Sequence, residues 1–176
     1  RDIKPDNLGI VAQGKNNERH LVLFDLSLAA APLSDLNAGT PGYLEPFLGE
    51  GDRKVWDLWA ERYAAAVTLV EMATGELPTW GDGQTNPAFT EGEATIALDV
   101  IDPELRQPLG QFFERALRRD WTKRFDTAED MLRAWQRAFE GLDVEHEDDG
   151  DAAAAGGAGA EAAPASSRLP EQLRLD

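Results

Sequence analysis

The sequence predicts a mainly α-helical domain that opens with a short β-hairpin and is followed by a disordered tail. Two short apolar runs near the start flank a stretch of Gly and Asn, which is the pattern of a hairpin. Residues 57–74 then read as a helix whose core, residues 64–70, has little polarity on any side, as expected of a helix inside a domain. From Asp143 the chain becomes acidic and then rich in Ala and Gly, a composition that cannot bury enough apolar surface to offset the entropy lost on ordering.

The first elements follow from local sequence signals. The hairpin is expected to pair residues 8–11 with residues 20–24. Residues 25–46 are expected to form a loop, because Gly and Pro interrupt them repeatedly. The buried helix over 57–74 is expected to end at Gly75, since Gly commonly follows the last residue of a helix.

Three further helices are expected after a loop rich in Gly, Pro and Asn. Pro103 suits the first turn of the second of these helices, because its fixed φ matches a helix and an N–H is not needed there. Thr127 can cap the start of the third helix with its hydroxyl. The three expected helices cover about residues 93–100, 104–118 and 127–140.

The composition divides the chain into three parts. Residues 1–142 are expected to form the folded domain, and residues 143–168 an acidic linker rich in Ala and Gly. Residues 169–176 regain Leu at helical spacing and are interpreted as the start of a further domain. Because the chain opens on Arg-Asp without an initiator Met, we interpret it as a fragment of a longer protein.

Composition also limits the location and the partners that we expect. The chain contains no Cys, which excludes disulfides and thiolate metal sites and fits a reducing cytoplasm. No apolar run approaches the ~20 residues needed to span a bilayer, so no membrane partner is expected. The net charge of -16 argues against direct contact with nucleic acid by this segment.

Four residues near the start have the chemistry that phosphoryl transfer requires. The reaction needs a carboxylate to orient the attacking hydroxyl and accept its proton, a cation to offset developing charge, and oxygen ligands for Mg²⁺. Asp2 is the expected base, and Lys4 is the expected cation beside the transferred group. Asn7 and Asp25 are the expected metal ligands, because the hairpin returns Asp25 to the side of Asn7. The alternative is that Asp2 and Asn7 only form turns, which both residue types favour.

Five stretches of the sequence resemble, in order and spacing, the motifs of eukaryotic-type Ser/Thr protein kinases. The catalytic loop (Arg1–Asn7) is similar to H-R-D-x-K-x-x-N without its first His, and residues 23–27 resemble the metal-binding D-F-G segment. The docking loop (residues 38–46) resembles the substrate-docking motif G-T-x-x-Y-x-A-P-E. Residues 64–75 resemble the central helix of the kinase C-terminal lobe (C-lobe), and residues 116–125 its last conserved element. The resemblance therefore predicts a protein-kinase-like C-lobe.

The resemblance implies specific roles for residues in this C-lobe. It assigns catalysis to Asp2, Lys4 and Thr40, with Thr40 as the hydroxyl that links the other two. It assigns ATP binding to Lys4, Asn7 and Asp25, the last two through Mg²⁺.

The same resemblance defines the expected reaction. The protein is expected to use ATP and Mg²⁺ and to phosphorylate a protein substrate. In this family the Gly-rich phosphate loop and an ATP-binding Lys precede the position of Arg1. We therefore expect residues 1–176 by themselves to be inactive.

Two positions depart from the family pattern. The Gly of D-F-G is Ser27, which has less backbone freedom, so a flip of this segment is less favourable. The Glu of A-P-E falls at Phe47, while a carboxylate stands two positions earlier as Glu45. We expect Glu45 to take over the ion pair with Arg124, which matches the family's Arg.

A third departure points to a sub-family. Glu61 matches the Asp that opens the central helix and is expected to bond the backbone of the catalytic loop. Together with the Ala-rich run that follows, these substitutions resemble the large bacterial kinases of phage-growth-limitation (BREX-type) defence systems. Other proteins of such a defence system are then expected partners.

Several alternatives stay open. Arg1 either binds a phosphorylated residue, since Arg suits phosphate, or is a plain surface residue. Ser34 is either a phosphorylation site or an ordinary loop residue. Ser27 and Phe47 leave open a pseudokinase that acts as a scaffold. A small-molecule phosphotransferase is disfavoured, because small substrates need no docking loop.

Overall fold

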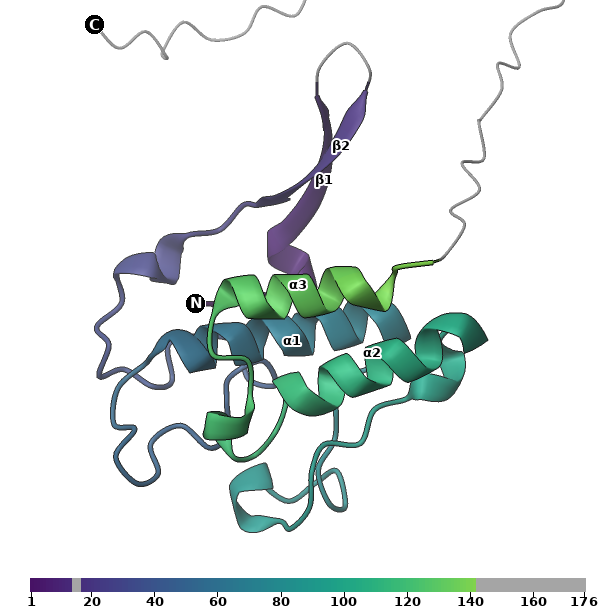
Figure 1. The fold of residues 1–176 in the computed structure, drawn as a ribbon. Helices are drawn as coiled ribbons and strands as arrows, with labels where there is room; N and C mark the ends of the chain where they lie inside the picture. Colours follow the sequence, from purple (N-terminus) through teal and green to yellow (C-terminus); the bar gives the residue numbers. More distant parts are fainter. Residues whose placement is uncertain (14–16, 142–176) are drawn as a thin grey trace, which may run out of the picture. The chain divides into compact units, whose positions relative to one another are not determined.

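The computed structural model describes residues 1–13 and 17–141 (Figure 1). The turn of the hairpin, the expected linker and the expected further domain lie outside these residues. In the described part, three α-helices and one two-stranded sheet are joined by loops and short 3₁₀ turns. The 3₁₀ turns are Pro5–Asn7, Ser27–Ala30, Pro87–Phe89, Leu98–Val100 and Trp121–Lys123.

The strands β1 (Leu8–Gln13) and β2 (Glu18–Leu23) form an antiparallel hairpin that projects from the helices (Figure 1). The hairpin prediction is confirmed, and each strand extends two residues further toward the turn than expected. Beyond the sheet, the Phe24 amide donates to the Asn7 carbonyl oxygen at 2.9 Å. This bond sets Phe24 opposite Asn7, so the next residue, Asp25, leaves the hairpin beside the catalytic loop.

Helix α1 (Leu58–Thr74) forms the buried centre of the helical part and confirms the helix expected over 57–74. The Asp57 carboxylate caps its start by accepting a hydrogen bond from the Ala60 amide at 2.9 Å. At its end, Gly75 has a φ of 77°, a left-handed conformation that suits Gly. The buried residues of α1 are Ala60, Tyr63, Ala64, Ala66, Val67, Thr68 and Val70.

Helix α2 (Pro103–Ala116) packs against both α1 and α3 (Ala128–Ala138) (Figure 1). Pro103 occupies the first turn of α2, as expected. The Thr127 hydroxyl caps α3 by accepting a hydrogen bond from the Asp130 amide at 3.0 Å. Both helices end about two residues earlier than expected, which is the usual uncertainty at helix ends.

The prediction of a helix at residues 93–100 is wrong. Thr95 instead forms an isolated antiparallel bridge with Thr79, in which each amide donates to the other residue's carbonyl, at 2.7 and 3.0 Å. Because this cross-loop bridge satisfies the backbone groups of Thr95, they are not available to a helix. The end of the segment, Leu98–Val100, forms a 3₁₀ turn.

Aromatic side chains make up much of the core around α1. Phe47, Tyr63 and Trp80 pack together with ring centroids 6.2 to 6.5 Å apart. On the side of α2, Phe112 stacks on Phe125 at 5.3 Å. Such pairs contribute to stability beyond the area that they bury. All five Trp residues are buried or half-buried, in keeping with a packing role.

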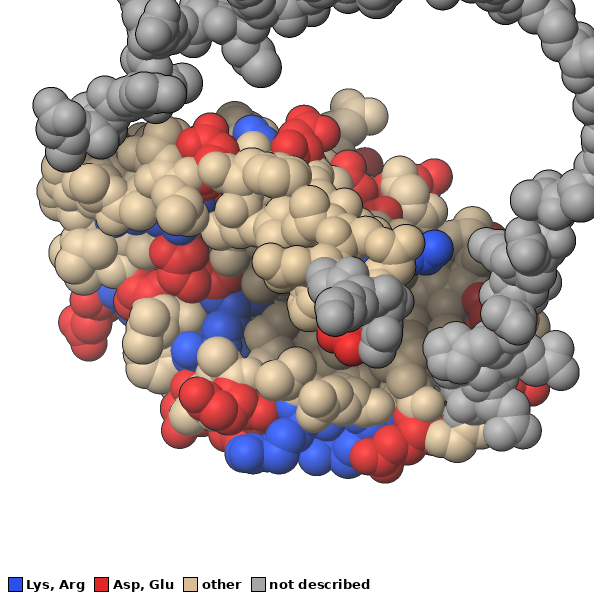
Figure 2. Space-filling model, turned by 90° about the horizontal axis from the view of Figure 1, so that it is seen from above, with Lys and Arg blue, Asp and Glu red and all other residues tan. Residues whose placement is uncertain are grey.

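The surface carries charges of both signs. On the face shown in Figure 2, Asp and Glu side chains lie among the Lys and Arg side chains. No helix in the described part of the chain is long and apolar enough to cross a membrane.

Candidate active site

The catalytic loop lies against α1 and is held there at two points. The terminal amino group of Arg1 donates to the Glu61 carboxylate at 3.0 Å, and the Thr68 hydroxyl lies 2.8 Å from the Ile3 carbonyl oxygen. The prediction that Glu61 bonds the backbone of this loop is therefore confirmed. The indole N–H of Trp56 donates to the same Glu61 oxygen at 2.7 Å, which orients the longer side chain.

Asp2, Lys4 and Thr40 form one hydrogen-bonded group. The Thr40 hydroxyl donates to Asp2 Oδ1 at 2.5 Å, and Lys4 Nζ donates to Thr40 Oγ1 at 2.7 Å. Lys4 Nζ also lies 3.2 Å from Asp2 Oδ2. The three residues that were assigned to catalysis are thus in mutual contact, although Thr40 comes from the docking loop.

Asn7 holds Asp2 in an uncommon conformation. Asp2 has a φ of 64°, which residues other than Gly seldom adopt. The Asn7 side-chain nitrogen donates to the Asp2 carbonyl oxygen at 2.8 Å and to Asp2 Oδ2 at 3.0 Å. Because the nitrogen is engaged with Asp2, the amide oxygen of Asn7 is the atom that would bind a metal ion.

The environment of Asp2 favours the ionised carboxylate. Burial opposes ionisation, but hydrogen bonds from Thr40, Lys4 and Asn7 outweigh burial and lower the pKa of Asp2. Asp2 is therefore a carboxylate at neutral pH and can accept a proton from a hydroxyl placed beside it.

Asp25 is exposed and follows β2 after one intervening residue, Phe24. Its Oδ1 accepts a hydrogen bond from the Ser27 amide at 2.8 Å, and the hydrogen bonds with Ser27 lower the pKa of Asp25. The charges of Asp2 and Lys4 also act on this pKa, in opposite directions. The bond between the Phe24 amide and the Asn7 carbonyl places Asp25 next to the end of the catalytic loop.

Asn7 and Asp25 fit the donor set of a Mg²⁺ site. Both offer oxygen atoms, and Mg²⁺ typically takes one or two carboxylate ligands and keeps water and phosphate oxygens for the rest. Over residues 1–13 and 17–141, no group of three or more His, Cys, Asp and Glu is placed to hold a metal ion. A Mg²⁺ ion held by Asn7 and Asp25 would have places left in its coordination shell for water and phosphate oxygens.

Comparison with known proteins identifies homologues along this part of the chain. No protein-family model matches it. The probable kinase PglW of Streptomyces coelicolor is 48% identical over 143 residues, which is 79% of this chain and 9% of PglW. The Ser/Thr protein kinase ypkA of Aspergillus fumigatus is 32% identical over 65% of this chain and 18% of its own length. The Ser/Thr protein kinase PEPKR2 of Arabidopsis thaliana is 32% identical over 76% of this chain and 27% of its own length.

PglW is named a probable kinase, and ypkA and PEPKR2 are named Ser/Thr protein kinases. This chain belongs to the Ser/Thr protein kinase family. The chain spans about a tenth to a quarter of the length of these curated relatives. Its mainly helical architecture with one small hairpin fits the C-lobe of a kinase, as the motifs predicted.

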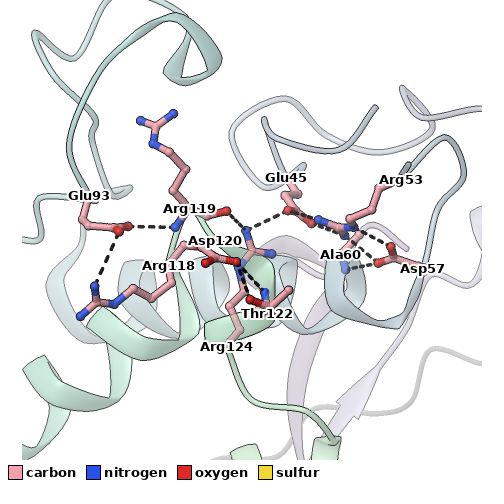
Figure 3. Close-up of polar contacts among 10 residues, drawn as sticks. All are labelled: Glu45, Arg53, Asp57, Ala60, Glu93, Arg118, Arg119, Asp120, Thr122 and Arg124. Carbon is pink, nitrogen blue, oxygen red and sulfur yellow. Dashed lines mark hydrogen bonds and ion pairs between the residues drawn. The ribbon is translucent and has the colours of Figure 1, made fainter. Parts of the chain in front are cut away.

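The kinase docking loop is tied to the helical core through Glu45 (Figure 3). Glu45 Oε1 lies 2.8 Å from Arg124 Nη2, so the predicted pairing from the shifted position is confirmed. A second cation, Arg53, also contacts Glu45 and reaches Asp57 at the start of α1. The vacated family position is filled by Phe47, which is buried against Tyr63 and Trp80 and stabilises the core instead.

Sequence reasoning missed Arg53 and the contact between Tyr43 and Glu71. The Tyr43 hydroxyl donates to Glu71 on α1, and burial together with this carboxylate raises the pKa of Tyr43 to about 12. Tyr43 belongs to the docking-loop motif, and this membership was a signal in the sequence that its side chain makes a specific contact. Arg53 lies outside every motif and has no characteristic spacing, so only the folded structure reveals its role.

Arg1 is not a plain surface residue. Its side chain is 3% exposed, its guanidinium lies 5.2 Å from the centre of the Trp56 ring, and Nη1 donates to the Asp35 carbonyl oxygen at 3.2 Å. Its proposed binding of a phosphorylated residue stays a prediction. Ser34 is exposed on the loop that Arg1 contacts.

Proposed function

We propose that this chain supplies the C-lobe part of the active site of a Ser/Thr protein kinase, which transfers the γ-phosphoryl group of ATP to a protein hydroxyl. The observation that carries the proposal is the bonded group of Asp2, Lys4 and Thr40. This group lies at the base of the hairpin whose two ends carry Asn7 and Asp25.

Each residue of the group has a distinct part in the proposed step. Asp2 accepts the proton of the substrate hydroxyl. The oxygen of that hydroxyl bonds to the γ-phosphorus of ATP as the bond from this phosphorus to ADP breaks. Lys4 offsets negative charge on the transferred phosphoryl group, and Thr40 keeps Lys4 and Asp2 in register. Asn7 and Asp25 would hold Mg²⁺, which would supply positive charge to neutralise the phosphate oxygens.

The docking loop supports a protein rather than a small molecule as the phosphate acceptor. Its Thr40 bonds Asp2 and its Glu45 is anchored to the helical core, an arrangement that a small acceptor would not require. The identity to PglW supports the sub-family expected from the sequence, the bacterial phage-growth-limitation kinases. Partners among other defence proteins are proposed on that basis alone.

A pseudokinase that acts as a scaffold is the alternative proposal. This alternative rests on two departures from the family pattern, Ser27 and Phe47. However, the Glu45–Arg124 pair replaces the contact that Phe47 cannot make. Asp25 also keeps its carboxylate beside Ser27. These contacts favour the active enzyme.

The test is phosphotransfer by the full-length natural protein. Asp2→Asn is expected to lower kcat by about 10²- to 10⁴-fold, the usual contribution of a general base. Asp99→Asn, which changes an exposed carboxylate on a distant 3₁₀ turn, is the control and is expected to leave the rate unchanged. A wild-type protein that binds a partner but transfers no phosphate would instead support the scaffold.

A further inference from the structure

We propose that Arg53 is a positioning residue that holds the docking loop in register with the catalytic loop. This inference rests on the proposed function, because a positioned docking loop affects turnover only in an active kinase. No kinase motif in the sequence includes Arg53. Its role is inferred from its hydrogen bonds to Glu45 and Asp57.

Arg53 grips two carboxylates from different parts of the chain (Figure 3). Toward the docking loop, Nη1 and Nη2 donate to Glu45 Oε1 and Oε2 at 2.5 and 2.7 Å. Toward α1, Nε and Nη2 donate to Asp57 Oδ2 and Oδ1 at 2.8 and 2.7 Å. Both contacts are bidentate, a geometry that Arg provides and Lys does not.

Most of the network is buried, and its two Arg side chains balance the charge of its two carboxylates; only Asp57 is partly exposed, at 22%. The side chains of Glu45, Arg53 and Arg124 are 0%, 9% and 3% exposed. Arg124 contacts one oxygen of Glu45, while Arg53 contacts both, so the orientation of the Glu45 carboxylate depends mainly on Arg53. The guanidinium of Arg53 also lies 5.5 Å from the centre of the Trp121 ring, which restricts its movement.

Arg53 thereby joins the two loops that form the active site. Asp57 caps α1, and one turn further along the same helix Glu61 bonds the backbone nitrogen of Arg1. The docking loop carries Glu45 at one end and Thr40, which bonds Asp2, near the other. Without Arg53, the Glu45 end of the docking loop would be held by Arg124 through one carboxylate oxygen, so the carboxylate would lose its fixed orientation.

The experiment compares Arg53→Met with Arg106→Met. Arg106 is a matched control, because it also makes several hydrogen bonds, to the carbonyls of Leu98, Asp99 and Ile101, but contacts neither loop of the site. Amide hydrogen exchange of residues 39–46 and the KM for a protein substrate are measured on the full-length natural protein. Arg53→Met is expected to raise both the exchange rate and KM by about tenfold, in line with loss of charged hydrogen bonds. Arg106→Met is expected to change neither.

Arg53→Lys separates positioning from overall stability. Lys can pair with one carboxylate but cannot grip both, so exchange of residues 39–46 is expected to stay above wild type even at temperatures well below unfolding. This variant also decides the question if Arg53→Met does not fold. Wild-type exchange of the docking loop in Arg53→Lys would overturn the inference.

The two proposals can fail separately. Hydrogen exchange requires no catalysis, so it tests Arg53 even if the wild-type protein transfers no phosphate. If Asp2→Asn abolishes activity while Arg53→Lys and Arg53→Met keep wild-type KM and exchange, the kinase proposal stands and the positioning role of Arg53 is wrong.

Discussion

At the scale of single residues, the Thr40 hydroxyl influences the chemistry of the site through two bonds. It donates to Asp2 and accepts from Lys4, so it contributes both to the low pKa of Asp2 and to the position of the cation. The folded-state pKa of Asp2 lies below its ordinary value, so its carboxylate form stabilises the fold above that value. This stabilisation is lost as the pH falls through the lowered pKa.

Thr40→Val is expected to raise the pKa of Asp2, because the carboxylate loses one of the hydrogen bonds that favour ionisation. The acid limb of kcat/KM should therefore move to higher pH, in addition to any loss of rate. The pH profile of phosphotransfer by the full-length natural protein measures this shift. Thr85→Val, which removes a hydroxyl bonded to Asp82 in an exposed loop, is the control. An unchanged acid limb in Thr40→Val would contradict the assignment.

At the scale of elements, α1 organises the site because both of its ends and its middle are engaged. Asp57 begins the helix and binds Arg53, Glu61 and Thr68 hold the catalytic loop, and Gly75 ends the helix. The active-site loops thus depend on a helix that is itself buried. Substitutions at either end of α1 should lower the free energy of unfolding more than they lower the rate of phosphotransfer.

Gly75→Ala tests the end of α1 by backbone strain alone. A Cβ at this position would meet no atom within 4 Å, but φ is 77°. The free energy of unfolding is expected to fall by about 1–2 kcal/mol. Gly75→Asn should lose less, because Asn tolerates this conformation better. Equal stability of Gly75→Ala and wild type in urea unfolding would show that the end of α1 relaxes freely.

The pair of Glu45 and Arg124 ties the docking loop to the segment between α2 and α3. Because both side chains are buried, Glu45→Gln and Arg124→Gln should each lower the free energy of unfolding by ~3–5 kcal/mol. Glu114→Gln removes the exposed partner of Arg118 and should lower it by less than about 1 kcal/mol. Thermal unfolding that is unchanged in both buried variants would refute the role of this pair.

At the scale of the whole molecule, the proposed function assigns the described residues to one side of a nucleotide site. Kinases hold ATP between two lobes, and the conserved phosphate loop and its Lys belong to the other lobe. The polypeptide of residues 1–176 is therefore expected to bind ATP weakly. We also expect it to transfer no phosphate by itself.

This expectation is checked with radiolabelled ATP and a generic protein substrate. No incorporation above background is expected from residues 1–176. Incorporation that Asp2→Asn abolishes would contradict it, because it would show that the C-lobe side of the site suffices for transfer.

Much of the fold was predictable because its signals are local. The hairpin, α1, the start of α2 at Pro103 and the Thr127 cap depend on local signals. These signals are turn residues, apolar periodicity and helix-start residues that lie within a few positions of each other. The helix expected at 93–100 was wrong because its local pattern competes with a bridge between Thr95 and Thr79, which are distant in sequence. A long-range backbone contact of this kind leaves no local signal.

The sequence by itself determined the kinase motifs and the set of catalytic and metal-binding candidates. It also predicted that Glu45 replaces the usual Glu in the ion pair with Arg124. Residue types and motif spacing can be read directly from the sequence, which is why these predictions were possible. Only the tertiary structure revealed that Arg53 shares Glu45 with Arg124 and that Arg1 is buried against Trp56. The physical reason is that such contacts arise where separate segments meet. Their energies come from burial and bidentate geometry, which no spacing along the chain encodes.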